Sequence, residues 1–273
     1  MKGDKMICAD FHVHTDFSGD SDTPMKDMIE RAIDIGLTQI CITDHMDHLY
    51  PEQYHMNFIF DVNEYFHQIE EISEYYKDRI KIYKGIELGL VPKLAGWYRE
   101  LVSKYSFDFV IGSSHIVDDL DPYYREYWEE KDEEEGYRRY FQSVLDNMDA
   151  YDDFDTYGHI DYIVRYGPCK NQNYSYEKYA DILDKILLAI IHKKKALEVN
   201  TSGYKYGLEQ SHPHRDIIKR YKELGGKYIT IGSDAHKPEH LAYDFRKISD
   251  ILVSLGFEYY TIFEHRNPKL IKF

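Results

Sequence analysis

The chain carries the stretch Asp10-Phe11-His12-Val13-His14-Thr15 at the end of its first apolar run, residues 6–11. In a β-strand, side chains two residues apart point to the same side, so His12 and His14 would project together from the end of this strand. Such a pair presents two imidazoles to one metal ion. Two histidines are too few for a complete metal site, and His-x-His also occurs by chance. The rest of the sequence therefore decides whether the pair is functional.

Length and composition limit the fold and the compartment. At 273 residues and 32.6 kDa, the chain has room for two domains or for one α/β barrel. No apolar stretch approaches the roughly 20 residues that cross a bilayer, and the first residues do not resemble a signal peptide. Cys8, Cys41 and Cys169 are scattered and odd in number, which favours a reducing compartment over a disulfide framework. We expect a soluble, cytoplasmic protein without a membrane partner.

The net charge restricts the possible partners. The formal charge of −15 would repel the phosphate backbone of DNA or RNA, so we expect no nucleic-acid partner. A cluster of divalent cations, by contrast, requires carboxylates and would offset part of the negative charge. The sequence contains no signature of an oligomeric state.

Predicted strands and helices alternate about seven times along the chain. The predicted strands cover residues 6–11, 39–43, 79–86, 107–111, a short segment ending within 156–161, and residues 196–199, 227–232 and 259–263. The predicted helices cover residues 24–35, 61–76, 94–105, 137–148, 177–194, 214–224 and 245–255, and residues 117–135 are the longest predicted loop. We find no repeat, linker or composition break, so we expect one domain over residues 1–273. The alternation predicts an α/β sheet that is either closed into a barrel or wound open.

The positions of the polar residues favour the barrel. They fall just after successive predicted strands, as expected for the C-terminal rim of a (β/α) barrel, where functional residues gather. An open sheet would spread them along an edge. The residues are His12, His14, Asp44, His45, Glu87, His115, His159, Asn200, Asp234 and His236.

Taken together, these residues indicate a metal site. A single histidine at a strand end is usually a structural hydrogen-bonding group, but six of the 14 histidines occupy equivalent positions here. Imidazoles and carboxylates without cysteine suit Zn, Mn or Fe(II) in a catalytic site. Because one ion does not need so many ligands, we expect two or three ions that share a bridging carboxylate.

In order along the chain, the motifs are His12-Val13-His14, Thr43-Asp44-His45, Glu87, Ser114-His115, Gly158-His159-Ile160-Asp161 and Ser233-Asp234-Ala235-His236. This series resembles the polymerase and histidinol phosphatase (PHP) superfamily over nearly the whole chain. Length and the segment Glu198-Val199-Asn200-Thr201-Ser202-Gly203 make the chain most similar to stand-alone histidinol-phosphate phosphatases. The resemblance implies a distorted, TIM-like, seven-stranded (β/α) barrel with a trinuclear metal site.

The resemblance also implies a distribution of ligands over three divalent ions, which are Zn, Mn or Fe. His12, His14, Glu87 and Asp234 would hold the first ion; Glu87 would bridge it to a second ion held by His115 and His159; and Asp20, His45 and His236 would hold the third. Asp16 and Asp22 lie in the same loop as Asp20 and are competing candidates for the third ion. Asp44 would orient its neighbour rather than bind metal.

The expected chemistry is the hydrolysis of a phosphate monoester. Clustered divalent ions lower the pKa of a bound water from 15.7 toward about 7 and stabilise charge on the attacking and leaving oxygens. An arginine that grips the phosphate would complete the site, and Arg165 and Arg215 are the candidates. We expect direct catalytic roles for His45, Glu87, Asp234 and His236. The donor of the proton to the leaving alkoxide stays open between a metal-bound water, His236 and an acidic residue.

The resemblance therefore implies a phosphatase that hydrolyses L-histidinol phosphate in histidine biosynthesis. Acidic or aromatic partners for the ammonium and imidazole of that substrate would come from the loops at residues 47–60 and 118–127. One alternative is a PHP phosphoesterase that acts on nucleotides or short oligonucleotides, against which the charge and the absence of a basic stripe weigh. Another is a non-catalytic metal-binding module, which we would expect to have lost some ligands.

Overall fold

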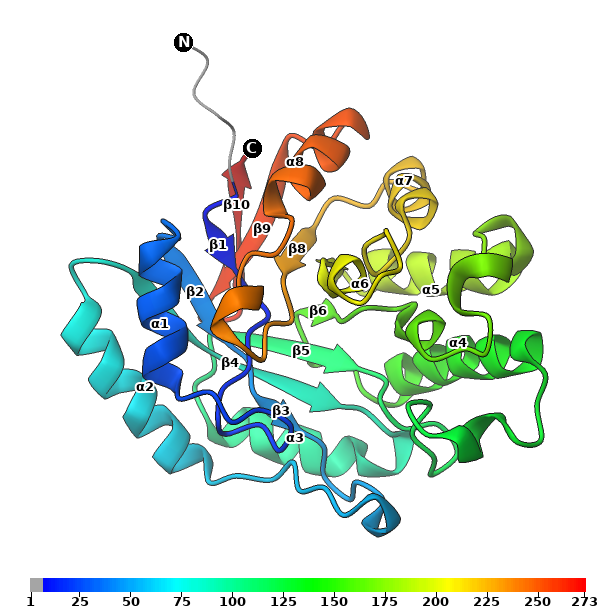
Figure 1. The fold of residues 1–273 in the computed structure, drawn as a ribbon, viewed down its shortest axis with the longest axis horizontal. Coiled ribbons are helices and arrows are strands. Elements are labelled where there is room, and N and C mark those ends of the chain that lie inside the picture. The colour runs from blue at the N-terminus through cyan, green and yellow to red at the C-terminus, as the bar shows by residue number, and fades with distance from the viewer. Residues whose placement is uncertain (1–6) are drawn as a thin grey trace.

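Strands and helices alternate along the chain in the computed structural model, which describes residues 7–273 (Figure 1). Seven parallel strands follow one another around the sheet in the order β1-β2-β4-β5-β6-β7-β8. They are β1 (Ala9–Asp10), β2 (Gln39–Ile42), β4 (Lys81–Gly89), β5 (Phe109–Ser113), β6 (Thr156–Tyr157), β7 (Ala196–Asn200) and β8 (Ile229–Gly232). A short strand, β3 (His45–Met46), pairs with β4 and continues the path of β2 after a break at Thr43 and Asp44.

The two ends of this sheet meet, so the strands form a barrel. Phe11 N donates to Ile231 O at 3.1 Å, and His14 N donates to Ala235 O at 2.9 Å. Val13 and Ala235 form a parallel bridge between these two contacts. The prediction of a seven-stranded, TIM-like (β/α) barrel is therefore confirmed, and the alternative of an open sheet is wrong.

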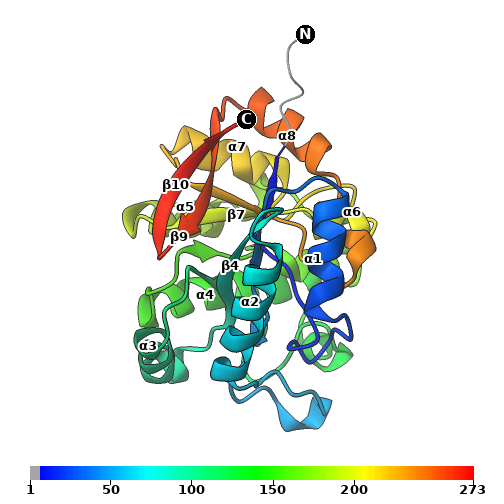
Figure 2. The ribbon, with the colours of Figure 1, turned by 90° about the vertical axis from the view of Figure 1, so that its left-hand side faces the viewer.

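Helices cover the outside of the barrel, as Figures 1 and 2 show. They are α1 (Met25–Asp34), α2 (Val62–Tyr76), α3 (Ala95–Lys104), α4 (Glu133–Ala150), α5 (Ala180–His192), α6 (Ser202–Lys205), α7 (Arg215–Glu223) and α8 (Phe245–Ser254). Each of the seven longer helices lies at a position predicted from apolar periodicity. In α1, for example, Met25, Met28, Ile29 and Ala32 are buried, and the helix ends before Gly36, whose φ is +85°. No helix within residues 7–273 is long and apolar enough to cross a membrane.

Several boundaries differ from the prediction. β1 is shorter than the predicted strand, whose Met6 lies outside the described residues, and Glu87 lies within β4 instead of after it. The predicted loop at residues 117–135 contains a short 3-10 helix, Arg125–Trp128, and overlaps the start of α4. There, Asp132 and Glu135 form a reciprocal capping box, which explains why the acidic run begins a helix.

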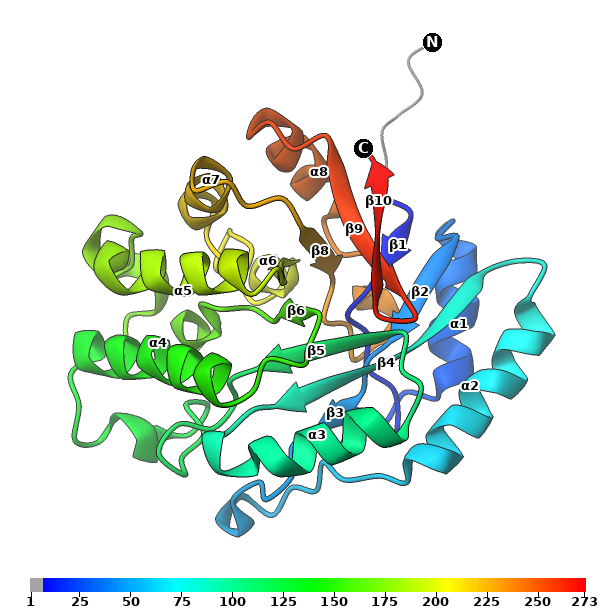
Figure 3. The same ribbon diagram turned by 180° about the vertical axis from the view of Figure 1, so that it is seen from behind.

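An antiparallel hairpin at the C-terminus lies against the barrel at the ends where β5 and β6 begin (Figure 3). It consists of β9 (Tyr259–Glu264) and β10 (Asn267–Lys272), of which only the first was predicted. At its turn, Arg266 N donates to Asp108 O, and the Arg266 guanidinium pairs with Asp155. The hairpin thus covers the barrel at the end opposite to the predicted metal ligands.

Candidate metal centre

All nine predicted metal ligands meet at the C-terminal mouth of the barrel. His12 and His14 follow β1, Asp20 lies in the next loop, His45 is in β3 and Glu87 is in β4; His115, His159, Asp234 and His236 follow β5, β6 and β8. Each lies within 4.0 Å, atom to atom, of at least one other member of the set. Neither Asp16 nor Asp22 pairs with a histidine of the set in the described part of the chain, whereas Asp20 does. The structure therefore favours Asp20 among the three aspartates of its loop.

Glu87 lies at the centre of the group and is fully buried. Its Oε1 lies 3.0 Å from His159 Nε2 and 3.3 Å from His115 Nε2. Its Oε2 lies 2.8 Å from His45 Nδ1 and 3.1 Å from His12 Nε2. Oε2 also lies 3.6 Å from His14 Nε2. Because each oxygen faces its own set of imidazoles, the carboxylate has the arrangement required to bridge two cations.

A second carboxylate, Asp234, lies on the other side of His14. Its Oδ1 lies 3.3 Å from His14 Nε2 and 3.6 Å from His236 Nδ1. Beyond His236, Asp20 Oδ2 lies 3.1 Å from His236 Nε2 and 3.8 Å from His45 Nε2. The backbone of Asp234 has φ of +53°, a conformation that is uncommon outside glycine and is found at functional sites.

The buried polar atoms of the centre fit metal ions. Among residues 7–273, several of them meet no partner in hydrogen-bond geometry, namely His12 Nε2, His14 Nε2, His45 Nδ1, Glu87 Oε2 and His236 Nε2. Unpaired buried polar groups are costly, and a cation between them would remove this cost. Three sets of ligand atoms lie within 4.8 Å of one another: His12-His14-Glu87, His14-His45-His236 and His45-Glu87-His115. The first set falls within one predicted ligand group, while the other two combine residues from different predicted groups.

The hydrogen bonds behind the histidines direct the free nitrogens inward. The Ser18 hydroxyl donates to Asp44 Oδ1 at 2.8 Å, so its oxygen accepts from His14 Nδ1 at 3.1 Å and from His45 N at 2.9 Å. His14 therefore carries its proton on Nδ1 and leaves Nε2 free for a metal. Asp44 also accepts from Thr15, and burial raises its pKa to about 6 although these hydrogen bonds lower it.

Two carboxylates outside the set of predicted metal ligands orient further ligands. Glu198 in β7 lies 2.5 Å from His12 Nδ1 through Oε1 and accepts from His159 N at 2.7 Å through Oε2. Asp47 Oδ2 lies 2.7 Å from His115 Nδ1. A carboxylate that accepts from Nδ1 fixes the imidazole so that Nε2 faces the metal. In the sequence, Glu198 lies in the segment that resembles histidinol-phosphate phosphatases, and Asp47 begins a loop predicted to contact the substrate.

The charged groups at the centre shift one another's pKa values strongly. Burial alone would lower the pKa of His12, but Glu198 and Glu87 raise it well above its ordinary value. Burial likewise opposes the effect of Glu87 and Asp20 on His45, whose pKa rises to about 9. Although burial raises the pKa of Glu87, the surrounding histidines hold it well below its ordinary value. The carboxylates thus remain ionised and attract positive charge, supplied either by protons on imidazole or by metal ions.

The two predicted arginines have different environments. Arg165 ends a short 3-10 helix, Tyr162–Arg165, and its guanidinium carbon lies 3.1 Å from the ring centre of Tyr206. No carboxylate within residues 7–273 pairs with Arg165, which lines a cavity together with Asp234 and other predicted ligands. The structure does not bring Arg215 to the centre. Its exposed side chain extends toward α8, where Nη2 contacts Ser254 Oγ at 3.4 Å, because the start of α7 directs it outward.

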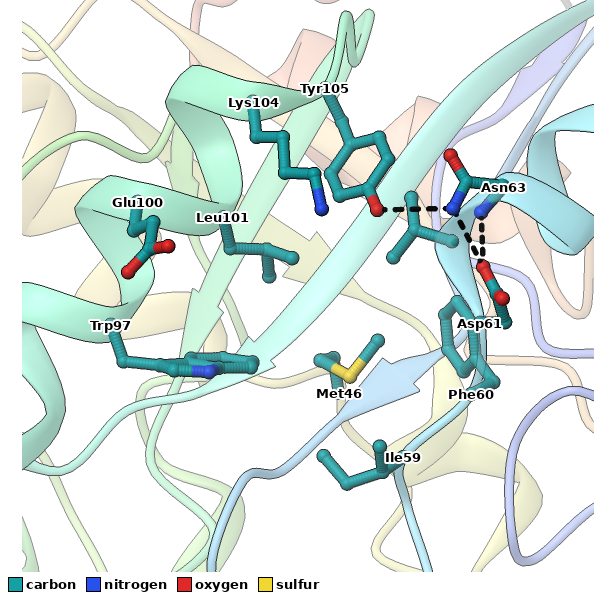
Figure 4. Close-up of a pocket in the computed structure, with 11 residues that line it drawn as sticks. Met46, Ile59, Phe60, Asp61, Asn63, Trp97, Glu100, Leu101, Lys104 and Tyr105 are labelled. Atoms are coloured by element: carbon teal, nitrogen blue, oxygen red, sulfur yellow. Dashed lines mark hydrogen bonds between the residues drawn. The ribbon is translucent and has the colours of Figure 1, made fainter.

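Cavities adjoin the centre and also occur elsewhere. One of about 290 Å³ opens beside the metal ligands and is lined by residues of both predicted substrate loops: Asp20, His45, Asp47, Tyr50, Met56, Phe58, His115, Asp121, Tyr123, Tyr124, Tyr162, Arg165 and Tyr166. A larger cavity of about 690 Å³ lies between α2 and α3 on the flank of the barrel (Figure 4). It contains no predicted ligand, and its Asp61 and Asn63 hydrogen-bond to each other. Because it adjoins the predicted metal ligands and Arg165, the cavity of about 290 Å³ is favoured as the substrate site.

The family is evident from comparison with known proteins. The PHP domain model matches residues 10–202. The chain belongs to the PHP family. Among curated relatives, the histidinol-phosphatase of Lactococcus lactis is 32% identical over 96% of this chain and 98% of that protein. A protein of Clostridium acetobutylicum named probable histidinol-phosphatase is 34% identical over 87% of this chain and 89% of that protein.

Solved structures agree with this assignment. The histidinol phosphate phosphatase of Lactococcus lactis, crystallised with zinc, L-histidinol and phosphate, matches with a TM-score of 0.89 at 32% identity. The match covers 96% of this chain and 98% of that one. A structure from Listeria monocytogenes matches at 18% identity with a TM-score of 0.74, covering 85% of this chain and 96% of that one, and supports the fold alone.

Proposed function

We propose that the protein is a metal-dependent phosphatase that hydrolyses L-histidinol phosphate to L-histidinol and phosphate in histidine biosynthesis. The observation that carries this proposal is the match, over nearly the full length of both chains, to an enzyme crystallised with zinc, L-histidinol and phosphate. The buried group of histidines and carboxylates around Glu87 supplies the donors that such a reaction requires. We assign the activity to one cytoplasmic domain that comprises residues 1–273.

We assign three divalent ions, with zinc as the first choice, to the mouth of the barrel. His12, His14, Glu87 and Asp234 would hold one ion; Glu87, His115 and His159 a second; and Asp20, His45 and His236 the third. Bound divalent ions supply a nucleophile at neutral pH and stabilise charge on the phosphoryl oxygens. The unpaired, inward-facing nitrogens of the histidines support this assignment.

Arg165 is our candidate for the residue that grips the phosphate. Its guanidinium is stacked on Tyr206, makes no ion pair with a described carboxylate and faces the cavity that also contains Asp234 and His236. A planar, preorganised guanidinium presents two parallel N–H donors to phosphate oxygens. With Arg215 turned away from the centre, we assign this role to Arg165 alone.

Catalytic contact with the reacting group is assigned to His45, Glu87, Asp234 and His236. Glu87 and Asp234 keep their negative charge and hold the imidazoles in place. His236 is partly exposed, with its side chain 20% accessible, and lines the same cavity as Arg165.

The test compares substrates. The purified protein, with its metal content measured, is assayed for phosphate release from L-histidinol phosphate, a panel of nucleotide monophosphates and a panel of sugar phosphates. We expect the highest kcat/KM for L-histidinol phosphate. A clear preference for a nucleotide would favour the alternative PHP phosphoesterase, and the absence of hydrolysis at full metal loading would favour a metal-binding module.

A further inference from the structure

Two loops meet over the cavity of about 290 Å³, and an acidic residue lies where they join. Tyr54, from the loop at residues 47–60, stacks on Tyr124, from the loop at residues 118–127. Their ring centres are 3.9 Å apart and the angle between the ring planes is 4°. Beside this stack, Tyr50 OH donates to Asp121 Oδ2 at 2.5 Å. The contacts thus hold Asp121 in a fixed position in the cavity wall, although its loop has little regular structure.

The carboxylate of Asp121 is buried without an ion-pair partner. Its residue is 7% exposed, and its Oδ1 accepts from Tyr123 N at 2.7 Å. No lysine, arginine or histidine among residues 7–273 forms an ion pair with it. Buried carboxylates without an ion-pair partner are costly, and burial raises the pKa of Asp121 although nearby His115 opposes the rise. A cation that entered the cavity would offset this cost.

Other residues that line the same cavity suit a group of opposite charge. They are His45 and His115 of the metal centre together with Arg165, and they suit a phosphate. A ligand that satisfies both sets of residues carries a phosphate and a cationic N–H donor. Nucleotides and most sugar phosphates lack such a cation.

We propose that Asp121, positioned by Tyr50 and Tyr123, is the specificity-determining residue that binds a cationic N–H group of the substrate. The inference rests on the proposed function, since L-histidinol phosphate offers two such groups, its ammonium and its protonated imidazole. Tyr50, Phe58 and Tyr124 line the same wall and provide ring faces against which either group can pack.

The test uses Asp121→Asn and three substrates. They are L-histidinol phosphate, 3-(imidazol-4-yl)propyl phosphate, which lacks the amine, and 2-aminopropyl phosphate, which lacks the imidazole. For L-histidinol phosphate we expect kcat/KM to fall about 10- to 100-fold, mainly through KM, as for loss of a charge-assisted hydrogen bond. For the analogue that lacks the group bound by Asp121, the variant and the unchanged protein should react equally well, and this identifies the group.

Two further variants separate recognition from structure. Tyr50→Phe removes one donor to Asp121 and should give a smaller loss with the same substrate pattern. Asp119→Asn, on the same loop, changes a carboxylate that is 79% exposed and paired with Lys93, and should leave all rates unchanged. The metal content and circular dichroism of every variant are compared with those of the unchanged protein.

The possible outcomes are distinct. Equal losses on all three substrates, or no loss on L-histidinol phosphate, would overturn the role of Asp121. Failure of the unchanged protein to hydrolyse L-histidinol phosphate would instead refute the proposed function, and the inference would fall with it. A loss confined to substrates that carry one of the two cationic groups would support the inference.

Discussion

At the scale of single residues, the structure assigns the central position to Glu87. The carboxylate is fully buried, Ser113 Oγ donates to its Oε1 at 2.6 Å, and histidines approach both of its oxygens. A buried carboxylate with one neutral donor and several imidazoles is stable only when positive charge surrounds it. The metal content and the activity should therefore depend on this one charge.

Substitution of Glu87 tests that dependence. Glu87→Gln keeps the size of the side chain and removes its charge, so we expect loss of bound metal together with a fall in kcat of about 10³-fold or more. Elemental analysis and steady-state assays measure the two effects on one sample. Glu100→Gln, an exposed change in α3, serves as the control. Retention of both metal and activity in Glu87→Gln would refute the bridging role.

Glu198 offers a test of how the ligands are oriented. Its carboxylate can only accept from His12 Nδ1, whereas the amide of Glu198→Gln can also donate and thereby favour the other tautomer. We expect metal affinity to fall about 10- to 100-fold while the fold is retained. Competition with a chelator measures the affinity. An unchanged affinity would mean that Glu198 does not hold the His12 tautomer.

The limits of sequence analysis at this scale follow from geometry. The positions of the predicted ligands follow from strand ends, because parallel strands bring their C-terminal ends to one rim. Glu198, Asp47 and Ser18 could not be found in this way, since their contribution depends on which imidazole nitrogen each one contacts. The direction of a long side chain at a helix start is likewise not encoded in spacing, which explains the wrong expectation that Arg215 would reach the site.

At the scale of elements, one strand path of the barrel is interrupted beside the metal centre. β2 and β3 are separated at Thr43 and Asp44, where the Asp44 carboxylate turns to bind the loop after His14. Near the end of β7, Asn200 Nδ2 contacts Asp234 Oδ2 at 3.4 Å. Apolar periodicity predicted the seven long helices and the seven parallel strands of the barrel, but neither β3 nor β10. The periodicity could not predict the interruption at Thr43 and Asp44, because it arises from contacts between segments that are distant in the sequence.

The C-terminal hairpin illustrates the same limit. β10 is largely exposed and contains Pro268, so it shows no alternating pattern that would identify it as a strand. Its position comes from tertiary contacts at the turn. The Arg266 guanidinium lies 2.5 Å from Asp155 Oδ2, whose residue is 7% exposed, and 3.0 Å from Asp153 Oδ1.

Removal of this contact should affect stability rather than catalysis. Arg266→Ala leaves Asp155 buried without its partner, and we expect the free energy of unfolding to fall by about 3 kcal/mol. Arg125→Ala is the matched control, because Arg125 is 91% exposed and its pairing with Glu129 is worth little. Urea denaturation measures both variants. If the free energy of unfolding falls no more in Arg266→Ala than in the control, the stabilising role of the hairpin turn is contradicted.

At the scale of the whole molecule, protons and metal ions compete for the same centre. The pKa of His45 is raised from 6.5 to about 9 in the metal-free protein, mainly because Glu87 and Asp20 outweigh burial. A raised pKa in the folded state stabilises the fold below about pH 6.5, and this contribution is lost as the pH rises through about 9. Metal binding replaces the proton and should remove this dependence.

Chelator-treated protein tests the competition. Between pH 6.5 and 9.5 we expect its free energy of unfolding to decrease by up to about 3 kcal/mol, with a smaller decrease in the zinc-loaded protein. Urea denaturation at a series of pH values measures both, and His45→Gln should reduce the decrease in the metal-free protein, with His12 and His115 contributing the remainder. A metal-free unchanged protein whose free energy of unfolding does not depend on pH in this range would contradict the charge arrangement around His45.

The measurement that tests the whole account most directly is a zinc titration of the chelator-treated protein, followed by the rate of phosphate release from L-histidinol phosphate. We predict that the metal-free protein is inactive and that the rate rises to a plateau at three ions per chain. Full activity without metal, or a plateau at one ion, would contradict a phosphatase built on a trinuclear centre around Glu87.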